Sequence, residues 1–478
     1  MLPTISTGNV ASALAGGYEV ANSLRFNDGS SDSLSLSVSG TSQSTTGTIS
    51  FWFKRSTISA DQRVFTNYID ANNYGGIKLQ SDDKMEIVII DGGSVTGKLV
   101  TNRLFRDVSA WYHCVVSIDS SNSTAGNRMR LYINGSEETS FSTDTNPSSS
   151  ATMEFFTNGT NRIGQFNSSQ YYDGYIAEFV MIHGTQLDAT SFGEFDEDSP
   201  NIWKPIDVST LSFNSKDYYL DFENASSLGA DVSGNSNNFT VNNLTSVDQS
   251  TDTCTNNFAT MNSIAVPPSN APTFAEGNTK VSTNSSNANP VISTIGVSQG
   301  KWYAEAKRIS FDSGSDDDGF RIGFGVTYDD NVNLVPAGIA DSGHYFMIGT
   351  GTVYNGSTDL GDKAGDSNIS DNGVVGIALD LDNNRISWAF NGAWMTGSNA
   401  WSGSSPSSYV TIESGKTYFF LQTDGSTGRG YTAGWNFGGS SAFTISSGNS
   451  DANGYGNFEY PVPSGYYALN TKNLAEFG

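Results

Sequence analysis

The chain of 478 residues carries a formal net charge of −25, from 49 acidic against 24 basic residues. This balance disfavours nucleic acid as a partner, because binding to phosphates requires clustered lysine and arginine. The two cysteines, Cys114 and Cys254, exclude a disulfide framework and a cysteine-rich metal site. The 51 glycines and the 15% share of charged residues are typical of many short strands joined by turns.

The first segment, residues 1–22, has small side chains, is interrupted by glycine and is weakly apolar. We expect it to be an extended arm that becomes ordered on a partner. It lacks the basic start and the unbroken apolar stretch of an export signal, and the sequence contains no run of eighteen apolar residues. The expectation is therefore a soluble chain without membrane insertion and without an export signal of its own.

Residues 23–196 alternate apolar and polar side chains over several runs, which is the pattern of half-buried β-strands. The clearest signal lies at 111–136, where a core run is followed by a polar turn, a second alternating run and Asn134-Gly135. Asn-Gly after such a run favours a type I′ hairpin turn, in which both residues have positive φ. We therefore predict an antiparallel β-sandwich in this part of the chain.

A stretch with two prolines, residues 197–210, is predicted to be the linker to a second domain. The same hairpin signal recurs at 374–394, so residues 211–478 are predicted to form a second antiparallel sandwich. We expect a long surface loop at 251–290 and an extended C-terminal tail in this domain. The predicted fold class is all-β, with two antiparallel jelly-roll sandwiches in tandem behind an N-terminal arm.

Both predicted sandwiches resemble known families. Residues 24–195 resemble the laminin-G or concanavalin-like lectin family, through FWFK at 51–54, WYHCVVSID at 111–119, LYINGS at 131–136 and DGYIAEFVMIHGTQL at 173–187. The second domain resembles the SPRY family, through GKWYAEAK at 300–307, FRIGFGV at 320–326, NGVVGIALDLDNNRISWAFNG at 372–392 and WNFG at 435–438.

The order of these two parts is similar to that in virion proteins of tailed bacteriophages. The MLPTISTGNVASAL start, the phrases NNFTVNN and TCTNNFATMN, and the PSGYYALNTKNL end agree with this resemblance. It implies a non-enzymatic tail fibre or related appendage in the virion that binds host surface carbohydrate or protein. It also implies anchoring to other virion proteins through residues 1–22 and, because fibre appendages are commonly homotrimers, a homo-oligomer. A head-decoration or adaptor protein and a polysaccharide depolymerase are the alternatives.

Candidate sugar-binding residues are aromatic side chains outside the core alternation, because a pyranose has an apolar face and a rim of hydroxyls. Tyr171 and Tyr172 lie in a loop with Gly, Ser and Gln, and Tyr68 and Tyr74 flank an Asp-Ala-Asn-Asn turn. Packing of these rings against a neighbour is the alternative for all four.

The resemblance to laminin-G domains implies a candidate Ca²⁺ site at the rim of the first sandwich. Asp28 and Asp32 have a spacing compatible with Ca²⁺, but without the glycine and glutamate of an EF-hand loop. Asp316, Asp317 and Asp318 form a second carboxylate cluster, for which a solvated acidic turn is the alternative.

In the second sandwich, the SPRY resemblance implies partner recognition by loops at one end. The candidate loop residues are Tyr328, Asp329, Asp330, Tyr354, Asn355, Trp394 and Trp401. Trp394 directly follows an Asn-Gly turn, so we expect it to be more exposed than Trp388, which lies on the alternating core face.

Glucanases with concanavalin-like sandwiches place two carboxylates on one concave face, as the acid and the nucleophile. Pairs of acidic residues in this sequence are therefore considered as glycosidase candidates. Glu194, Asp196 and Asp198 alternate after the last strand of the first sandwich, and Asp221 and Glu223 share one face of a predicted edge strand. The first group lacks the apolar flanks that would fix a strand there, and the second lies at a predicted edge. The three histidines lie near no Ser or Cys nucleophile signature. We therefore expect no enzymatic activity.

Overall fold

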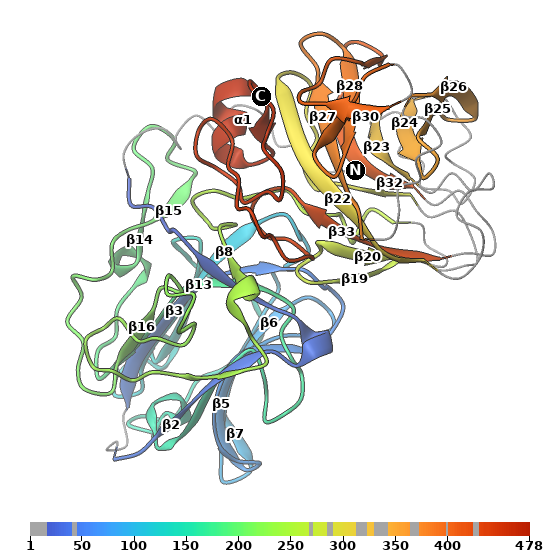
Figure 1. Cartoon of the computed structure of the whole chain (residues 1–478). Helices are drawn as coiled ribbons and strands as arrows, with labels where there is room; N and C mark the ends of the chain where they lie inside the picture. Colours follow the sequence, from blue (N-terminus) through green and yellow to red (C-terminus); the bar gives the residue numbers. More distant parts are fainter. Residues whose placement is uncertain are drawn as a thin grey trace. The chain divides into compact units, whose positions relative to one another are not determined.

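The structure is a computed structural model in which the chain forms two compact units (Figure 1). The N-terminal unit ends at Thr255 and the C-terminal unit begins at Asn256. The structure describes residues 17–40, 45–266, 271–283, 290–311, 323–328, 343–363, 372–397, 400–423 and 430–478. Strands dominate both units, which confirms the all-β prediction. None of the helices in these ranges has the length and apolar character needed to cross a membrane.

The N-terminal unit contains two eight-stranded antiparallel sheets. The first sheet consists, in spatial order, of β10 (Ser136–Glu137), β9 (Met129–Ile133), β8 (Trp111–Asp119), β3 (Thr46–Arg55), β13 (Gly174–His183), β1 (Ser23–Phe26) and β18 (Gln249–Ser250), with β16 (Tyr218–Leu220) also paired to β13. The second consists of β11 (Phe141–Thr145), β7 (Ser94–Thr101), β6 (Met85–Asp91), β5 (Asn73–Leu79), β4 (Gln62–Asp70), β12 (Gly159–Ile163), β2 (Ser33–Val38) and β17 (Thr240–Asn242).

The connections of this unit carry short elements. A two-stranded ribbon is formed by β14 (Gly193–Phe195) and β15 (Trp203–Pro205). The 3-10 helices are η3 (Asp28–Ser30), η4 (Ala125–Asn127), η5 (Glu154–Phe156), η6 (Ala189–Ser191) and η7 (Ser246–Asp248).

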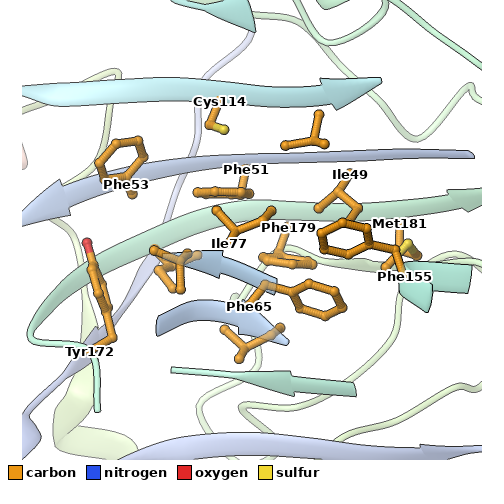
Figure 2. Close-up of a cluster of buried hydrophobic side chains, with 14 of the residues drawn as sticks. Ile49, Phe51, Phe53, Phe65, Ile77, Cys114, Phe155, Tyr172, Phe179 and Met181 are labelled. Atoms are coloured by element: carbon orange, nitrogen blue, oxygen red, sulfur yellow. The ribbon is translucent and has the colours of Figure 1, made fainter. Parts of the chain in front are cut away.

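The main core of the N-terminal unit contains side chains from both sheets (Figure 2). Phe51 of β3 and Phe179 of β13 stack with their ring centroids 5.5 Å apart, and Phe65 of β4 lies 5.5 Å from Phe179. Cys114 of β8 is fully buried in the same cluster as a free thiol, as its position on the apolar side of the strand predicted. Because side chains alternate along a strand, the neighbours of these residues face away from this core.

Both Asn-Gly turns adopt the predicted conformation. Asn134 and Gly135 have φ of 47° and 77°, and they join β9 to β10 with Ile133 opposite Ser136. The equivalent turn in the C-terminal unit has φ of 49° and 79° at Asn391 and Gly392. Positive φ at both central residues is the geometry of the type I′ turn, so the hairpin prediction is confirmed in both units.

The boundary between the units lies later than the predicted linker at 197–210. Strands β16, β17 and β18, which follow that stretch, pair with β13, β2 and β1 of the first sandwich. Strand β15 lies within the predicted linker and pairs with β14. The alternation after residue 211 therefore belongs to strands that cover open edges of the N-terminal unit rather than to a new domain. The predicted loop 251–290 spans the boundary, and its residues 267–270 and 284–289 lie outside the described residues.

The last residues of the predicted N-terminal arm pack on the N-terminal unit. Val20 is buried, and its N–H donates to the hydroxyl of Thr255 at 3.1 Å. The hydroxyl of Tyr18 donates to the carboxylate of Glu178 at 3.2 Å. This part of the segment thus finds its packing partner within the chain, whereas residues 1–16 lie outside the described residues.

The C-terminal unit also contains two sheets. The larger consists of β19 (Thr273–Ala275), β20 (Lys280–Ser282), β33 (Tyr431–Asn436), β22 (Lys301–Phe311), β27 (Val374–Asp380), β28 (Arg385–Phe390), β29 (Ala393–Met395) and β30 (Trp401–Gly403), with β31 (Val410–Thr411) paired to β28 and β34 (Tyr467–Ala468) paired to β22. The smaller consists of β21 (Val291–Ile292), β32 (Tyr418–Thr423), β23 (Gly323–Tyr328), β24 (His344–Ile348), β25 (Thr352–Asn355) and β26 (Thr358–Asp362).

The core of the C-terminal unit contains the fully buried indoles of Trp302, Trp388 and Trp435. The end of the chain differs from the predicted extended tail, because β34 pairs in parallel with β22 and helix α1 (Thr471–Phe477) follows it. Asn470 caps this helix by accepting a hydrogen bond from the N–H of Asn473.

Candidate ligand-binding face

The outer face of three neighbouring strands of the N-terminal unit carries a row of polar residues. In the register of strands β12, β4 and β5, Arg162 lies opposite Thr66, and Thr66 lies opposite Gly76. The residues next to them in sequence, Phe65 and Ile163 among them, are fully buried in the core. Because side chains alternate between the two faces of a sheet, Arg162 and Thr66 are on the face turned away from that core.

The guanidinium of Arg63 occupies the space above Gly76. The register of β4 and β5 shifts between Arg63 and Phe65, which marks a β-bulge or irregularity there. A Cβ at Gly76 would collide with Nη1 of Arg63. Glycine at this position therefore lets the guanidinium of Arg63 approach the backbone of β5 closely.

Three aromatic rings border this row. Tyr68 and Tyr74 lie directly opposite each other on β4 and β5. Phe166, which follows β12, makes edge-to-face contacts with both, at centroid distances of 5.5 and 5.0 Å. The guanidinium of Arg63 lies 4.9 Å from the Phe166 ring, and that of Arg162 lies 5.0 Å from the Tyr68 ring. We call these five residues, together with Thr66, the arginine–aromatic cluster.

Several polar atoms of the cluster have no hydrogen-bond partner within the described part of the chain. These are Nη1 of Arg63, Nη1 of Arg162 and Oγ1 of Thr66. Nε of Arg63 donates to the side-chain oxygen of Gln170 at 3.1 Å. Burial lowers the pKa of both arginines, opposed most strongly by Glu86 at Arg63 and by Tyr68 at Arg162. Such atoms suit a polar ligand, because a buried unpaired donor is costly.

The structure brings together two of the four tyrosines predicted for the first sandwich. Tyr68 and Tyr74 are half-buried and adjacent, whereas Tyr171 is half-buried outside the cluster. Tyr172 is fully buried and its hydroxyl donates to the backbone oxygen of Lys54 at 2.9 Å, so its assignment to a ligand site was wrong. A loop position in the sequence does not exclude burial, and here the ring of Tyr172 packs in the main core, 6.1 Å from the ring of Phe26.

Sequence reasoning missed Arg63, Arg162 and Phe166. A signal was present in NRIGQF, where Arg162 precedes the core residue Ile163 and must face the other side of its strand. The partnership with Arg63 depends on strand pairing between residues far apart in the sequence, which a local pattern does not reveal.

The candidate Ca²⁺ residues have separate roles in the structure. Asp32 is buried, and its carboxylate accepts a hydrogen bond from the N–H of Asn27 at 3.0 Å. Asp28 is exposed in the first turn of η3. In the described ranges, no group of three or more His, Cys, Asp or Glu side chains is placed to hold a metal ion.

In the C-terminal unit, two predicted loop residues are buried. Tyr328 is 6% exposed and donates to the carboxylate of Glu413 at 3.1 Å. Trp394 is 3% exposed and contacts Tyr303, so it is buried like Trp388 rather than presented to a partner. The residue after an Asn-Gly turn begins the next strand, and here that strand position faces a buried cluster.

The other predicted loop residues of this unit are half-buried or lie outside the described residues. Tyr354 is half-buried and stacks on Phe346 at 5.8 Å. Trp401 is half-buried and packs on Phe390 at 5.9 Å. Asn355 accepts a hydrogen bond from the N–H of Gly343 at 2.6 Å. Residues 316–318, 329 and 330 lie outside the described residues.

The carboxylates considered for glycosidase chemistry make local contacts. Asp196 is buried and accepts from the N–H groups of Asp198 and Ser199, and Lys204 lies 3.4 Å from it and 3.3 Å from Glu194. Asp221 accepts from the N–H of Glu223.

His113 also has a role that the sequence did not indicate. It lies in a buried apolar layer, where Trp203 donates to Nδ1 at 3.0 Å and Nε2 lies 2.9 Å from the hydroxyl of Ser50. Because Nδ1 accepts a hydrogen bond, Nε2 carries the proton and donates to Ser50. Burial lowers the pKa of His113 to about 3. The imidazole is thus neutral and has no capacity to accept a proton from that serine.

In each unit a buried glutamate accepts hydrogen bonds from a segment near one end of the described chain. Glu178 has φ of 51° at a β-bulge of β13 and accepts hydrogen bonds from Tyr219 at 2.7 Å and Tyr18 at 3.2 Å. Glu305 of β22 accepts from the backbone N–H groups of Glu459 and Tyr460. Burial raises the pKa of both carboxyls to about 7, in opposition to these hydrogen bonds.

Comparison with known proteins supports a lectin-like first part. Residues 28–190 match a laminin-G-type family model of the Concanavalin A-like lectin/glucanases superfamily. The match covers every strand of the arginine–aromatic cluster, and a domain of this type fits a binding role. No curated protein matches the chain.

Solved structures also share similarity with the chain. The SPRY domain of human HERC1 is 11% identical, with 37% of this chain and 96% of that chain covered and a TM-score of 0.29. The heptameric SAP-like pentraxin from Limulus polyphemus is 15% identical, with coverage of 34% and 77% and a TM-score of 0.27. Domains LG4-5 of the mouse laminin alpha1 chain are 11% identical, with coverage of 97% and 98% and a TM-score of 0.29.

Proposed function

We propose that this protein is a non-enzymatic binding protein whose N-terminal unit binds saccharides on the arginine–aromatic cluster. The observation that carries the proposal is the pair of half-buried tyrosines, Tyr68 and Tyr74, beside guanidinium groups on the outer face of a lectin-like sandwich. A tyrosine ring packs against the apolar face of a pyranose, and guanidinium N–H groups donate to its oxygens. Both kinds of group lie on one face of the sheet.

The contacts of the carboxylates considered for glycosidase chemistry support a binding role over a catalytic one. The carboxylate of Asp196 is occupied by backbone N–H groups and Lys204, and Glu194 shares that lysine. An acid and a nucleophile of a glycosidase must instead flank one open substrate position.

We propose further that the chain is an appendage of a bacteriophage virion, located in the particle and attached through residues 1–22 to other virion proteins. The support is the order of a laminin-G-like part and a SPRY-like part, together with the sequence phrases at both ends. On this proposal the bound saccharide belongs to the host surface, and the protein is a homo-oligomer in the particle.

The test is binding of labelled full-length protein to an array of bacterial surface saccharides. We expect saturable binding that falls at least tenfold in Tyr68→Ala and Tyr74→Ala. The control is Tyr409→Ala in the C-terminal unit, which removes a half-buried tyrosine under the guanidinium of Arg385, 3.7 Å from its ring. Equal binding by all four proteins, or no binding by any, contradicts the proposal.

Two further readouts separate the alternative functions. A depolymerase would generate new reducing ends from the bound saccharide, whereas a binding protein leaves the chain length unchanged. A head-decoration or adaptor protein would bind purified particles but not host cells. Addition of EDTA tests whether Ca²⁺ contributes to binding.

A further inference from the structure

The two arginines of the cluster lack the acidic partners that other buried cations of the N-terminal unit have. Arg25 pairs with Asp248 at 2.9 Å, Lys54 with Asp252 at 2.8 Å and Arg55 with Asp83 at 3.1 Å. Within the described residues, Arg63 and Arg162 have no carboxylate oxygen within 4.0 Å. This is unexpected in a chain with 49 acidic residues and a net charge of −25.

An unpaired cation in this position is costly for the fold. Arg63 is 4% exposed and Thr66 is fully buried, and each has an unpaired polar atom on the same face. Removing a guanidinium from water without an anion costs several kcal/mol, on the order of the penalty for one buried ion. Ring faces at 4.9 and 5.7 Å, from Phe166 and Tyr74, offset only part of this penalty.

The unpaired donors are arranged in one row. Arg162 and Thr66 are directly opposite on adjacent strands, and the guanidinium of Arg63 lies above Gly76, the next residue across the sheet. A carboxylate has two oxygens with about four acceptor positions, and guanidinium is the side-chain group whose geometry matches it best. A neutral sugar hydroxyl would leave both guanidinium groups without a carboxylate in direct contact.

We propose that the arginine–aromatic cluster binds the carboxylate of an acidic sugar, with Arg63, Arg162 and Thr66 donating to the carboxylate and with Tyr68 and Tyr74 packing against the sugar ring. The inference rests on the proposed function and specifies its ligand as a sugar acid such as a uronic acid. It requires no metal, because the two guanidinium groups supply the positive charge.

The turn that carries Phe166 packs against the donors, with the Phe166 ring 4.9 Å from the guanidinium of Arg63. This turn pairs Phe166 with Ser169, and Asn167, Ser168 and Gln170 have φ of 41°, 65° and 51°. Non-glycine residues in the left-handed region each cost about 1 kcal/mol or more. The turn is held by its own backbone hydrogen bonds and by the N–H of Arg63, which donates to the carbonyl of Gln170 at 2.8 Å. On this proposal the turn moves outward when the ligand binds, and this movement makes the buried donors reachable.

The experiment uses the full-length protein and two acidic probes, polygalacturonate and hyaluronate oligomers, each beside its carboxyl-reduced counterpart. Reduction replaces the carboxylate by a hydroxymethyl group and leaves the ring in place. Calorimetric titration in EDTA should give at least tenfold tighter binding for one acidic oligomer than for its reduced form. The expected variant results are loss of this preference in Arg162→Gln and at least a threefold reduction in Arg162→Lys, which keeps the charge but loses the fork of donors.

The matched control is Arg103→Gln, which makes the same change of charge at a surface arginine paired with Glu138 at 2.8 Å. It should bind like the unmodified protein, and thermal unfolding should show that Arg162→Gln is folded. Binding of acidic and reduced oligomers with equal affinity would overturn the inference while leaving the proposed function intact. Retention of the preference for the acidic oligomer by Arg162→Gln would also overturn the inference and leave the proposed function intact. Absence of binding to any saccharide would overturn both.

Discussion

Replacement of Glu178 by glutamine should remove a specific part of the pH dependence of stability in the N-terminal unit. The carboxyl is 5% exposed, and burial raises its pKa to about 7 against hydrogen bonds from Tyr219 and Tyr18. A raised pKa in the folded state means that the fold favours the neutral acid. The contribution is therefore present in full below the unfolded pKa of 4.5 and is lost as the pH rises towards 7.

The magnitude follows from the difference between the two pKa values. A rise from 4.5 to about 7 corresponds to about 3 kcal/mol at about 1.4 kcal/mol for each pH unit. The free energy of unfolding should therefore fall by about 3 kcal/mol through Glu178 between pH 4.5 and pH 7, and by little more above that. Glutamine has nearly the same shape and no charge, so the variant should lack this slope and be more stable than the unmodified protein at pH 8.

The assay is hydrogen exchange of the full chain, followed by peptide mass spectrometry, across this pH range and corrected for intrinsic exchange rates. Peptides from β1, β3 and β13 report on the N-terminal unit. The matched control is Glu305→Gln, which should remove the corresponding slope from peptides of β22 and β33 and leave the N-terminal unit unchanged. If Glu178→Gln and the unmodified protein show the same slope in the N-terminal unit, the reasoning from burial is wrong.

Two further predictions concern a turn and the corrected site assignment. Gly135→Ala should lower the free energy of unfolding by about 3 kcal/mol, because its Cβ would be strained at φ of 77° and would also collide with the ring of Trp203. The control is Gly184→Ala, which has φ of 79° and open space around it. It should lower the free energy of unfolding by about 1 kcal/mol in the same denaturant titration. Tyr172→Phe should lower stability by about 1 kcal/mol through the lost hydrogen bond and leave saccharide binding unchanged. Tyr68→Ala should instead reduce saccharide binding. Reduced binding by Tyr172→Phe would contradict the assignment of Tyr172 to the core.

The sequence predicted those features that depend on neighbouring residues. Asn134-Gly135 fixes its turn because both residues tolerate positive φ, and the burial of Cys114 follows from alternation along one strand. The domain boundary could not be obtained in this way, because the pattern after residue 211 identifies a strand but not the sheet that it joins. Pairing of β17 with β2 joins residues more than two hundred positions apart.

The candidate site illustrates the same limit at the level of single residues. Tyr68 and Tyr74 were found because they flank one turn, and Tyr172 was misplaced because a loop position does not reveal which way a ring points. Arg63 and Arg162 come together only through the pairing of β4 with β12, and Arg63 reaches its place only because residue 76 is glycine.

Glu178 and Glu305 connect stability to segments near the two ends of the described chain. Glu178 accepts from Tyr18, close to the start of the described chain, and Glu305 accepts from the N–H groups of Glu459 and Tyr460. Ionisation strengthens these hydrogen bonds, yet the raised pKa values show that burial of the charge costs more than the bonds return. The free energy lost as the pH rises towards 7 is therefore lost where these terminal segments pack on their sheets. We expect the segments around Tyr18 and Tyr460 to gain hydrogen exchange before the central strands as the pH rises.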